Sequence, residues 1–430
     1  MSLADQASLL FIPSGYKSQK VYSIFPTDGD GDFDFSRSGS ATRIAKNGLI
    51  TTVDSNVPRL EYPLIDGVVN GCPSLLLEPQ STNLCDVSKV DAYNSSGTIS
   101  RNTLVSPSPT GVVDSVRLIK GSVGQEYFNL KATSTTLNAN TDYTQSIFVK
   151  RDNADFTFRL EHNISTNYGT PWNVSFTITN SGVTVNSEAN AIGKVKDYGS
   201  GWYRVSATVT TTTPTSPMTS CLFRLDGTNG IGASILLQYN QFEQQSYATS
   251  YIPTNGSTVT RNAETCNNAG DASTFNDSEG VLMAEISALA DYATRKAITI
   301  SDGISNNERV LLSYEGPYVR AFVYTNSLLQ CNFQALISDV SLINKIALKY
   351  KQNDFALWIN GIEVDTDTIG VTANGLDRLS FSDGNGANPF YGNTKQIQYY
   401  NSALTDSELE KLTSWTSFID MANGQQYSII

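Results

Sequence analysis

Histidine is nearly absent from this chain, whose 430 residues include only His162. A Ser-His-Asp or Cys-His catalytic site would have this one candidate base, and a zinc site built from several histidines cannot be assembled. His162 lies near the end of a predicted strand, so we interpret it as a structural or surface residue. Glycoside hydrolysis needs only two carboxylates beside a cleft, and the scarcity of histidine does not exclude it.

Paired carboxylates are missing from the region where such chemistry would be expected. Residues 277–400 contain no Glu-x-Asp-x-x-Glu or similar pattern that would set two acids on one strand face. Glu285 and Glu363 are isolated, and Asp365 and Asp367 directly follow a turn. We therefore predict that the protein is not an enzyme, and glycan depolymerisation is only the third hypothesis for its function.

Charge is sparse and mostly of one sign. Charged residues make up 16% of the chain, and the formal net charge is −12. No cluster of Lys and Arg is available to displace counterions from phosphates, which argues against nucleic acid and against an anionic membrane as partners. No apolar run approaches the roughly 20 residues that a transmembrane helix needs. The first residues include Asp5 and Gln6 and do not resemble a signal peptide.

Cysteine is rare and irregularly spaced. The chain has five, with no CxxC pair: Cys72, Cys85, Cys221, Cys266 and Cys331. An odd and dispersed set indicates buried small side chains in a protein folded in a reducing cytosol, rather than a disulfide framework.

The clearest structural signal is the stretch Lys345–Val364. Ile346, Leu348 and Tyr350 alternate with Ala347, Lys349 and Lys351, and the pattern resumes with Phe355, Leu357 and Ile359 after a polar turn, which predicts two antiparallel strands. The dipeptide Asn360-Gly361 then suits a two-residue type I′ turn into a third strand. Such a three-stranded meander has an apolar face that a second sheet must cover, so the stretch predicts a β-sandwich.

The remaining chain predicts an all-β protein of tandem jelly-roll sandwiches, with a smaller N-terminal β module and one short C-terminal helix. A chain of this length is too long for one core, and further alternating segments separated by turns occur throughout it. Thr405 and Glu408 form a capping-box pattern at the start of the predicted helix. The predicted modules are residues 1–85, 86–262 and 277–414, followed by a tail at 415–430. We interpret residues 263–276 as a linker or a crossover strand.

Several segments resemble known proteins. Lys349–Gly361, Ile300–Gly303 and Asn401–Leu409 resemble the concanavalin A-like (laminin-G-like) modules of bacteriophage and prophage structural proteins. Thr141–Lys150, Gly201–Ser206 and Gln241–Arg261 resemble a carbohydrate-binding-module-like jelly roll found before such modules. Segments within residues 35–84 resemble the lead segment of the same phage family.

The resemblance implies a non-enzymatic protein on the exterior of a virion, assembled in the host cytoplasm. Our first hypothesis is a fibre or adhesin that binds a host surface glycan. The second is a purely structural part, such as a capsid decoration, head-fibre or collar component. Other virion proteins are the expected partners, and residues 1–85 are the expected attachment module.

Two loops are candidate ligand sites. Sugar binding uses exposed aromatic platforms with polar neighbours, which Tyr168 and Trp172 would supply in the loop that starts at Thr166. The loop Asp383–Tyr391 offers oxygens from Asp383, Asn385 and Asn388 for a calcium ion, and its Tyr391 for a sugar. Turn propensity explains the same residues equally well.

Two further sets of residues have alternative interpretations. The alternating aspartates from Asp28 to Phe35 resemble a calcium loop, but Phe33 and Gly39 stand where that loop requires Gly and Glu, so a tight turn is favoured. A set of charged residues near the N-terminus suits a salt-bridged fold or a docking surface better than a catalytic cluster. Its members are Arg37, Arg43, Arg59, Glu61 and Glu78.

The tail at 415–430 is too apolar for free disorder. Its large apolar residues must pack on a surface, either the chain's own sandwich or a neighbouring subunit. We therefore predict a homo-oligomer, a trimer by analogy with virion fibres, with the tail contributing to its contacts.

Overall fold

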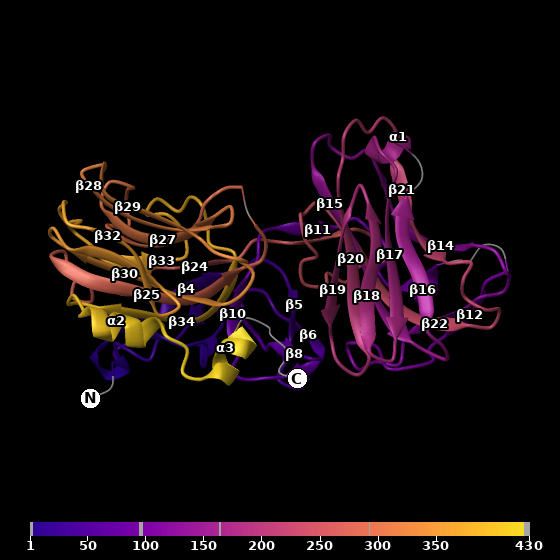
Figure 1. Cartoon of the computed structure of the whole chain (residues 1–430), viewed down its shortest axis with the longest axis horizontal. Helices are drawn as coiled ribbons and strands as arrows, with labels where there is room; N and C mark the ends of the chain where they lie inside the picture. Colours follow the sequence, from indigo (N-terminus) through magenta and orange to yellow (C-terminus); the bar gives the residue numbers. More distant parts are fainter. Residues whose placement is uncertain (1–2, 94–97, 163–164, 292, 425–430) are drawn as a thin grey trace.

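Two β-sandwiches lie side by side along the long axis of the molecule (Figure 1). The computed structural model describes residues 3–93, 98–162, 165–291 and 293–424. We name the sandwiches by their place in the chain: the middle sandwich is built from residues 98–243, and the C-terminal sandwich contains the predicted meander. The predicted all-β, jelly-roll fold class is confirmed.

The C-terminal sandwich packs an eight-stranded sheet on a five-stranded one. The larger sheet has the order β32-β31-β30-β25-β34-β10-β7, with β1 also paired to β34. Its strands are β1 (Leu9–Phe11), β7 (Arg59–Glu61), β10 (Ser74–Leu77), β25 (Glu279–Ala288), β30 (Asn344–Lys351), β31 (Phe355–Ile359), β32 (Ile362–Asp367) and β34 (Gly392–Tyr400). The smaller sheet consists of β29 (Leu328–Leu336), β28 (Tyr318–Thr325), β27 (Arg309–Glu315), β26 (Lys296–Ser301) and β33 (Arg378–Ser380), in that order.

The predicted meander is confirmed as β30, β31 and β32. Ile346 pairs with Ile359 across the first hairpin, and Ile359 pairs with Ile362 across the second. Asn360 and Gly361 have φ of 51° and 86°, the positive values that a type I′ turn requires. Ile346 belongs to the main core of the sandwich, so the apolar face is covered by the second sheet as predicted.

The N-terminal residues are not an independent module, which corrects the boundary predicted at residue 85. β1 and β10 both pair with β34, near the end of the chain, and extend the larger sheet. β4 (Phe33–Ser36) pairs with β24 (Thr265–Asn267), so the segment read as a linker or a crossover strand forms a strand. The N-terminal strands are too short to close a sandwich, and they bury Leu9, Phe11 and Leu75 in the core of the C-terminal one.

The middle sandwich packs a six-stranded sheet on a five-stranded one around its own core. The first sheet consists of β12 (Ser100–Thr103), β13 (Val116–Ile119), β22 (Ser234–Glu243), β15 (Asp142–Arg151), β20 (Trp202–Thr210) and β19 (Ile192–Asp197). The second consists of β14 (Glu126–Thr135), β21 (Met218–Leu225), β16 (Phe156–His162), β17 (Trp172–Thr179) and β18 (Gly182–Ala189). The short helix α1 (Ser165–Tyr168) follows β16.

The two sandwiches meet across the outer face of the six-stranded sheet. Ile50, in the hairpin of β5 (Ala41–Ile44) and β6 (Ile50–Val53), packs against Phe148, Trp202 and Tyr251. β11 (Ser81–Asn83) pairs with β23 (Val259–Arg261) where the chain enters and leaves the middle sandwich. The remaining short elements are η1 (Ala4–Gln6), β2 (Tyr16–Lys17), β3 (Lys20–Val21), β8 (Leu64–Ile65), β9 (Val68–Val69) and η2 (Val90–Ala92).

The predicted helix is confirmed as α2 (Asp406–Thr413), with the capping box of Thr405 and Glu408. Its buried Leu409 and Leu412 cover the face of the larger sheet that points away from the core. The tail continues into α3 (Phe418–Gly424), which the sequence did not predict. In α3, Gly424 accepts a hydrogen bond from the backbone N–H of Ile343 at 3.2 Å. This much of the tail packs on its own chain, and its last six residues lie outside the described residues.

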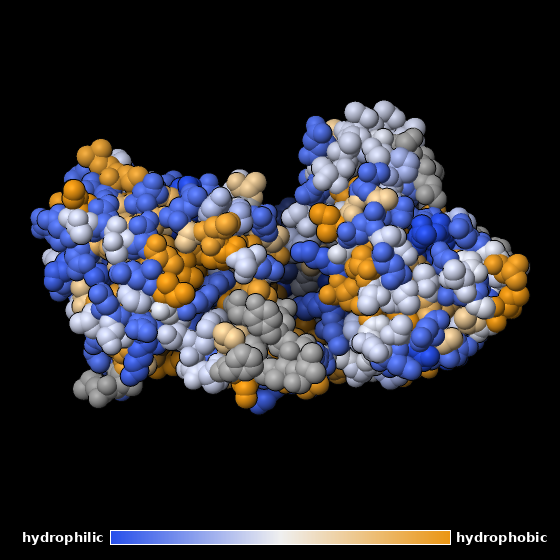
Figure 2. Space-filling view, in the orientation of Figure 1, coloured by the Kyte–Doolittle hydropathy of each residue, from blue (hydrophilic) through white to orange (hydrophobic). Residues whose placement is uncertain are grey.

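Polar and charged residues cover most of the face seen in the space-filling view (Figure 2), in keeping with the mean hydropathy of −0.22. Within the described part of the chain, none of the helices has the length and apolar character needed to cross a bilayer.

Candidate functional site

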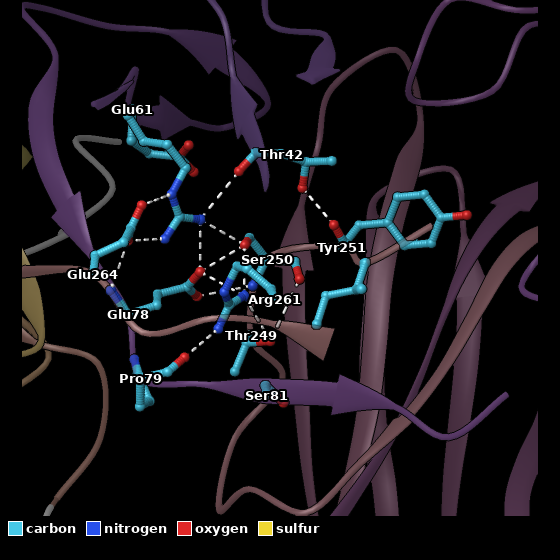
Figure 3. A network of polar contacts seen from close by, with 12 residues as sticks. Thr42, Glu61, Glu78, Pro79, Ser81, Thr249, Ser250, Tyr251, Arg261 and Glu264 are labelled. Atoms are coloured by element: carbon cyan, nitrogen blue, oxygen red, sulfur yellow. Dashed lines mark hydrogen bonds and ion pairs between the residues drawn. The ribbon is translucent and has the colours of Figure 1, made fainter. Parts of the chain in front are cut away.

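A buried network of ion pairs joins the N-terminal segment to the middle sandwich (Figure 3). Arg59, at the start of β7, contacts Glu78 at 2.7 Å and hydrogen-bonds Glu264 through Nε at 2.9 Å and through Nη2. Arg37 contacts the same Glu264 at 2.7 Å. The side chains of Arg37, Arg59 and Glu264 are 0% exposed.

Glu78 joins this network to Ser250, in the segment that follows β22 of the middle sandwich. Its Oε2 accepts a hydrogen bond from the hydroxyl of Ser250 at 2.6 Å, and its Oε1 accepts one from the Ser250 N–H at 2.9 Å. Arg261 approaches the Glu78 carboxylate at 2.8 Å and donates to the Ser250 hydroxyl at 3.0 Å. Nearby, Ser81 donates to Glu243 on β22 at 2.6 Å. We call Arg37, Arg59, Glu78, Arg261 and Glu264 the junction network.

The electrostatics of the junction network keep Glu78 and Arg59 charged. Burial opposes ionisation of Glu78, but Arg261 and Arg59 outweigh it and hold the pKa of Glu78 well below its usual value. Burial likewise opposes the charge on Arg59, yet Glu264 and Glu78 raise its pKa. These groups are buried and ion-paired with one another, so a substrate has no access to them.

The salt-bridged interpretation of the N-terminal charges is therefore confirmed for Arg37, Arg59 and Glu78. Arg43 and Glu61 have other hydrogen-bond partners: Arg43 contacts the hydroxyl of Tyr16 at 3.4 Å, and Glu61 accepts from the Ile44 N–H at 2.7 Å. Sequence reasoning missed the two partners that complete the network, Arg261 and Glu264. Their only signal was that they flank the connection between the two sandwiches.

The aromatic residues predicted as a sugar platform are buried, which corrects that prediction. Tyr168 is 0% exposed and Trp172 is 1% exposed. The structure brings them together edge to face at 5.7 Å, inside the core of the middle sandwich. The Tyr168 hydroxyl contacts the Cys221 sulfur at 3.3 Å. Trp172 is the first residue of β17, and its side chain points into the core. The segment before β17 therefore directs both rings inward.

The predicted calcium loop is held by its own hydrogen bonds. Asp383 is buried and accepts from the Asn388 amide at 2.7 Å, while Asn385 is exposed and accepts from the Ala387 N–H at 3.1 Å. Tyr391 is half-buried, with the Lys296 ammonium 5.4 Å from its ring centre. No group of three or more His, Cys, Asp or Glu among the described residues is arranged to hold a metal ion.

His162 and most cysteines are structural. His162 is 4% exposed and shares a 2.7 Å hydrogen bond with Asn167. Burial lowers the pKa of His162, because it disfavours the charged imidazolium. Four cysteines are buried as predicted, and Cys72 is exposed. Burial raises the pKa of Cys221 to about 12, so its thiol is not a ready nucleophile.

An open cavity of about 530 Å³ lies at one end of the middle sandwich. Loops 153–155 and 228–233 form its walls, and Thr157 and Thr177 form part of its floor. Asn229 bonds both the N–H and the carbonyl of Thr157, at 2.8 and 2.6 Å. The walls are therefore fixed before any ligand arrives, and they present hydroxyl and backbone groups beside the exposed Ile231. Sequence reasoning did not single out this cavity, because its residues are ordinary turn formers.

The outer face of the smaller sheet in the C-terminal sandwich carries a second unusual group of side chains. Three arginines lie against two aromatic rings, and we call the group the arginine–aromatic face. Its members are Arg295, Arg309, Arg320, Phe322 and Tyr324.

Comparison with known proteins finds no matching family model and no matching curated protein. Similar solved structures include the CBM40 of Ruminococcus gnavus IT-sialidase bound to α2,3-sialyllactose. That likeness has 20% identity and a TM-score of 0.30, and covers 33% of this chain and 86% of that one. A K499G mutant of NanB sialidase from Streptococcus pneumoniae has 14% identity and a TM-score of 0.29, over 33% of this chain and 25% of that one.

A native heptameric SAP-like pentraxin from Limulus polyphemus is also similar, with 11% identity and a TM-score of 0.26, over 33% of this chain and 71% of that one. These identities concern the fold alone, and TM-scores of this size carry no argument about what this chain binds.

Proposed function

We propose that this chain is a non-enzymatic glycan-binding protein of the fibre or adhesin type, on the exterior of a virion. The open cavity of the middle sandwich supports glycan binding. Its volume of about 530 Å³ suits a small saccharide, and its lining combines the polar side chains of Thr157, Thr177 and Thr228 with an exposed apolar side chain, Ile231. Saccharides present hydroxyls and C–H faces, so they complement such a lining.

The support for a virion exterior is the sequence resemblance alone. A role without catalysis is supported by the chemistry of the described residues. The cavity is lined by one carboxylate, that of Asp155, whereas glycoside hydrolysis needs two across a scissile bond. His162 is buried and bonded within the core of the middle sandwich, away from solvent.

Binding to a glycan array by the purified chain tests the proposal. Ile231→Arg would fill the mouth of the cavity and should weaken binding by about tenfold or more, a loss of about 1.4 kcal/mol. Ile231 is 63% exposed, so this substitution should not affect folding. Ile369→Arg is the matched control, because Ile369 is 79% exposed and lies on the C-terminal sandwich.

A parent chain that binds no glycan would refute the proposal and favour the second candidate, a purely structural virion component. The junction network supports that alternative, because it holds the two sandwiches rigidly as a spacer would require. If the array is negative, localisation of the chain on particles by electron microscopy tests the structural role.

A further inference from the structure

The arginine–aromatic face is built by neighbouring strands of the smaller sheet. Along β27 and β28 successive side chains point to opposite sides, and Val310 and Leu312 point into the core. The alternate residues therefore point outward. Arg309 is paired with Tyr324 across the two strands, and Ser313 with Arg320. Register alone thus gathers these side chains on one face.

This face has a small apolar floor. Ala297, Leu311 and Phe322 form a buried cluster separate from the main core, with Tyr324 packed against it. Leu311 is 0% exposed and Phe322 is 4% exposed although they point away from the interior of the sandwich. Side chains lying across the sheet must therefore cover them.

The covering side chains include arginines. The guanidinium of Arg295 lies 4.7 Å from the centre of the Phe322 ring, and that of Arg320 lies 5.6 Å from it. Arg309 lies 4.3 Å from the centre of the Tyr324 ring. The rings are thus occupied by cations and offer no free platform on which a neutral sugar could stack.

Positive charge on the face exceeds the negative charge that balances it. Glu315 contacts Arg320 at 2.9 Å and Arg295 at 3.8 Å, so two arginines share one carboxylate. Arg309 has no ion-pair partner among the described residues. It is 7% exposed, and its Nε and Nη1 are buried without a hydrogen-bond acceptor.

A second unsatisfied group lies on the same outer face as Arg309. The hydroxyl of Thr299 is buried and has no partner, and Thr299 pairs with Leu311 on the same outer face, two residues along β27 from Arg309. A buried cation without a counter-ion is costly, and native proteins satisfy nearly all buried polar groups. Two such groups at diagonal positions of the same face point to a ligand that binds there.

We propose that the arginine–aromatic face binds the carboxylate of an acidic saccharide, with Arg309 as the main contact. A guanidinium matches the planar geometry of a carboxylate and forms strong charge-assisted hydrogen bonds with it. The apolar floor suits the C–H groups of a sugar ring once the arginines turn toward the acid. The chain's net charge of −12 repels extended polyanions such as nucleic acid, whereas a single carboxylate needs only the local excess of arginine.

The choice of a saccharide rests on the proposed glycan-binding function, but the site is separate from the cavity of the middle sandwich. The probe is an oligogalacturonate, and its methyl ester is the matched neutral compound. Titration calorimetry of the full chain should show binding of the acid and at least tenfold weaker binding of the ester. Affinity for the acid should also fall as salt is added.

Arg309→Gln should weaken binding of the acid by about tenfold or more. It should not lower the melting temperature, because it removes a buried charge that has no partner. Arg117→Gln is the control, since Arg117 is an ion-paired arginine on the middle sandwich, contacting Asp152 at 2.6 Å. Arg320→Gln is a second variant on the face, and it should also weaken binding of the acidic saccharide.

Equal binding of acid and ester, or an Arg309→Gln variant that binds the acid as the parent does, would overturn this inference. A chain that binds neutral glycans through the cavity, sensitive to Ile231→Arg, but binds the oligogalacturonate no better than its methyl ester would overturn the inference while leaving the proposed function intact. A chain that binds no saccharide of either kind overturns both.

Discussion

Glu78→Gln should destabilise the protein strongly, although it changes one atom. The carboxylate is buried and accepts two hydrogen bonds from Ser250, and it is also the ion-pair partner of Arg59 and Arg261. Every neighbour of both its oxygens is a donor. Whichever oxygen a glutamine replaces with an NH₂ group, that group would face another donor.

The expected cost is about 3–5 kcal/mol, the usual penalty for breaking a buried ion pair by removing one partner. Arg59 keeps Glu264, but Arg261 is 1% exposed and loses the carboxylate that the structure places beside it. For a unit of 150–250 residues, each kcal/mol lowers the melting temperature by roughly 2–4 °C. Scanning calorimetry should therefore show a transition lowered by about 6–20 °C.

The pH dependence gives an independent check. The pKa of Glu78 is lower in the folded state than in the unfolded chain, so its stabilisation is complete above about pH 4.5. That stabilisation is lost as the pH falls from there toward the folded pKa. The difference in stability between the parent and Glu78→Gln should therefore shrink as the solution is acidified.

Glu363→Gln is the matched control, because Glu363 is exposed on the edge strand β32. The free energy of unfolding of the control should stay within about 1 kcal/mol of the parent's. If that of Glu78→Gln does so too, the junction network does not hold the two sandwiches together as argued.

Gly361→Ala should destabilise the chain by about 1–2 kcal/mol or more in urea, because φ is 86° and the new Cβ would lie 2.6 Å from the Ser414 hydroxyl. Gly375 has a φ of 68° with open space around it, so Gly375→Ala should lower stability less. Equal losses of stability in the two variants would show that the contact with Ser414 contributes nothing. His162→Gln should leave glycan binding unchanged, and because the pKa of His162 is lower in the folded state, the parent should lose stability as pH falls below about 6.5 while the variant should not. A chain that begins at residue 86 lacks β1, β7 and β10 and should not fold its C-terminal sandwich, which circular dichroism and proteolysis would show; a stable product would contradict the observed strand pairing. The predicted trimer stays a prediction, and sedimentation of the full chain and of one ending at Ser414 tests both the oligomer and the role of the tail.

Local patterns in the sequence determined much of the secondary structure. The meander and its Asn360-Gly361 turn follow from alternation and turn chemistry within 20 residues, and the capping box of α2 spans only four. Because the prediction depends on local alternation of apolar and polar residues, it misses strands that have few apolar residues. In β18, from Gly182 to Ala189, most residues are exposed, so hydrophobic alternation is too weak to reveal the strand.

Tertiary structure decided what each element contacts. Leu9 pairs with Tyr399, almost the whole chain away, so the N-terminal residues complete a distant sheet that local periodicity cannot indicate. Tyr168 and Trp172 have the composition of a sugar platform, but the direction in which their loop turns buries both rings.

The charged residues show the same division. The sequence favoured a salt-bridged fold or a docking surface for Arg37, Arg59 and Glu78, but it did not indicate Glu264 as their partner. Arg309 resembles any other strand arginine in the sequence. Only the packing of neighbouring strands shows that it is buried against Tyr324 without a carboxylate, because burial and pairing depend on residues brought close by the fold.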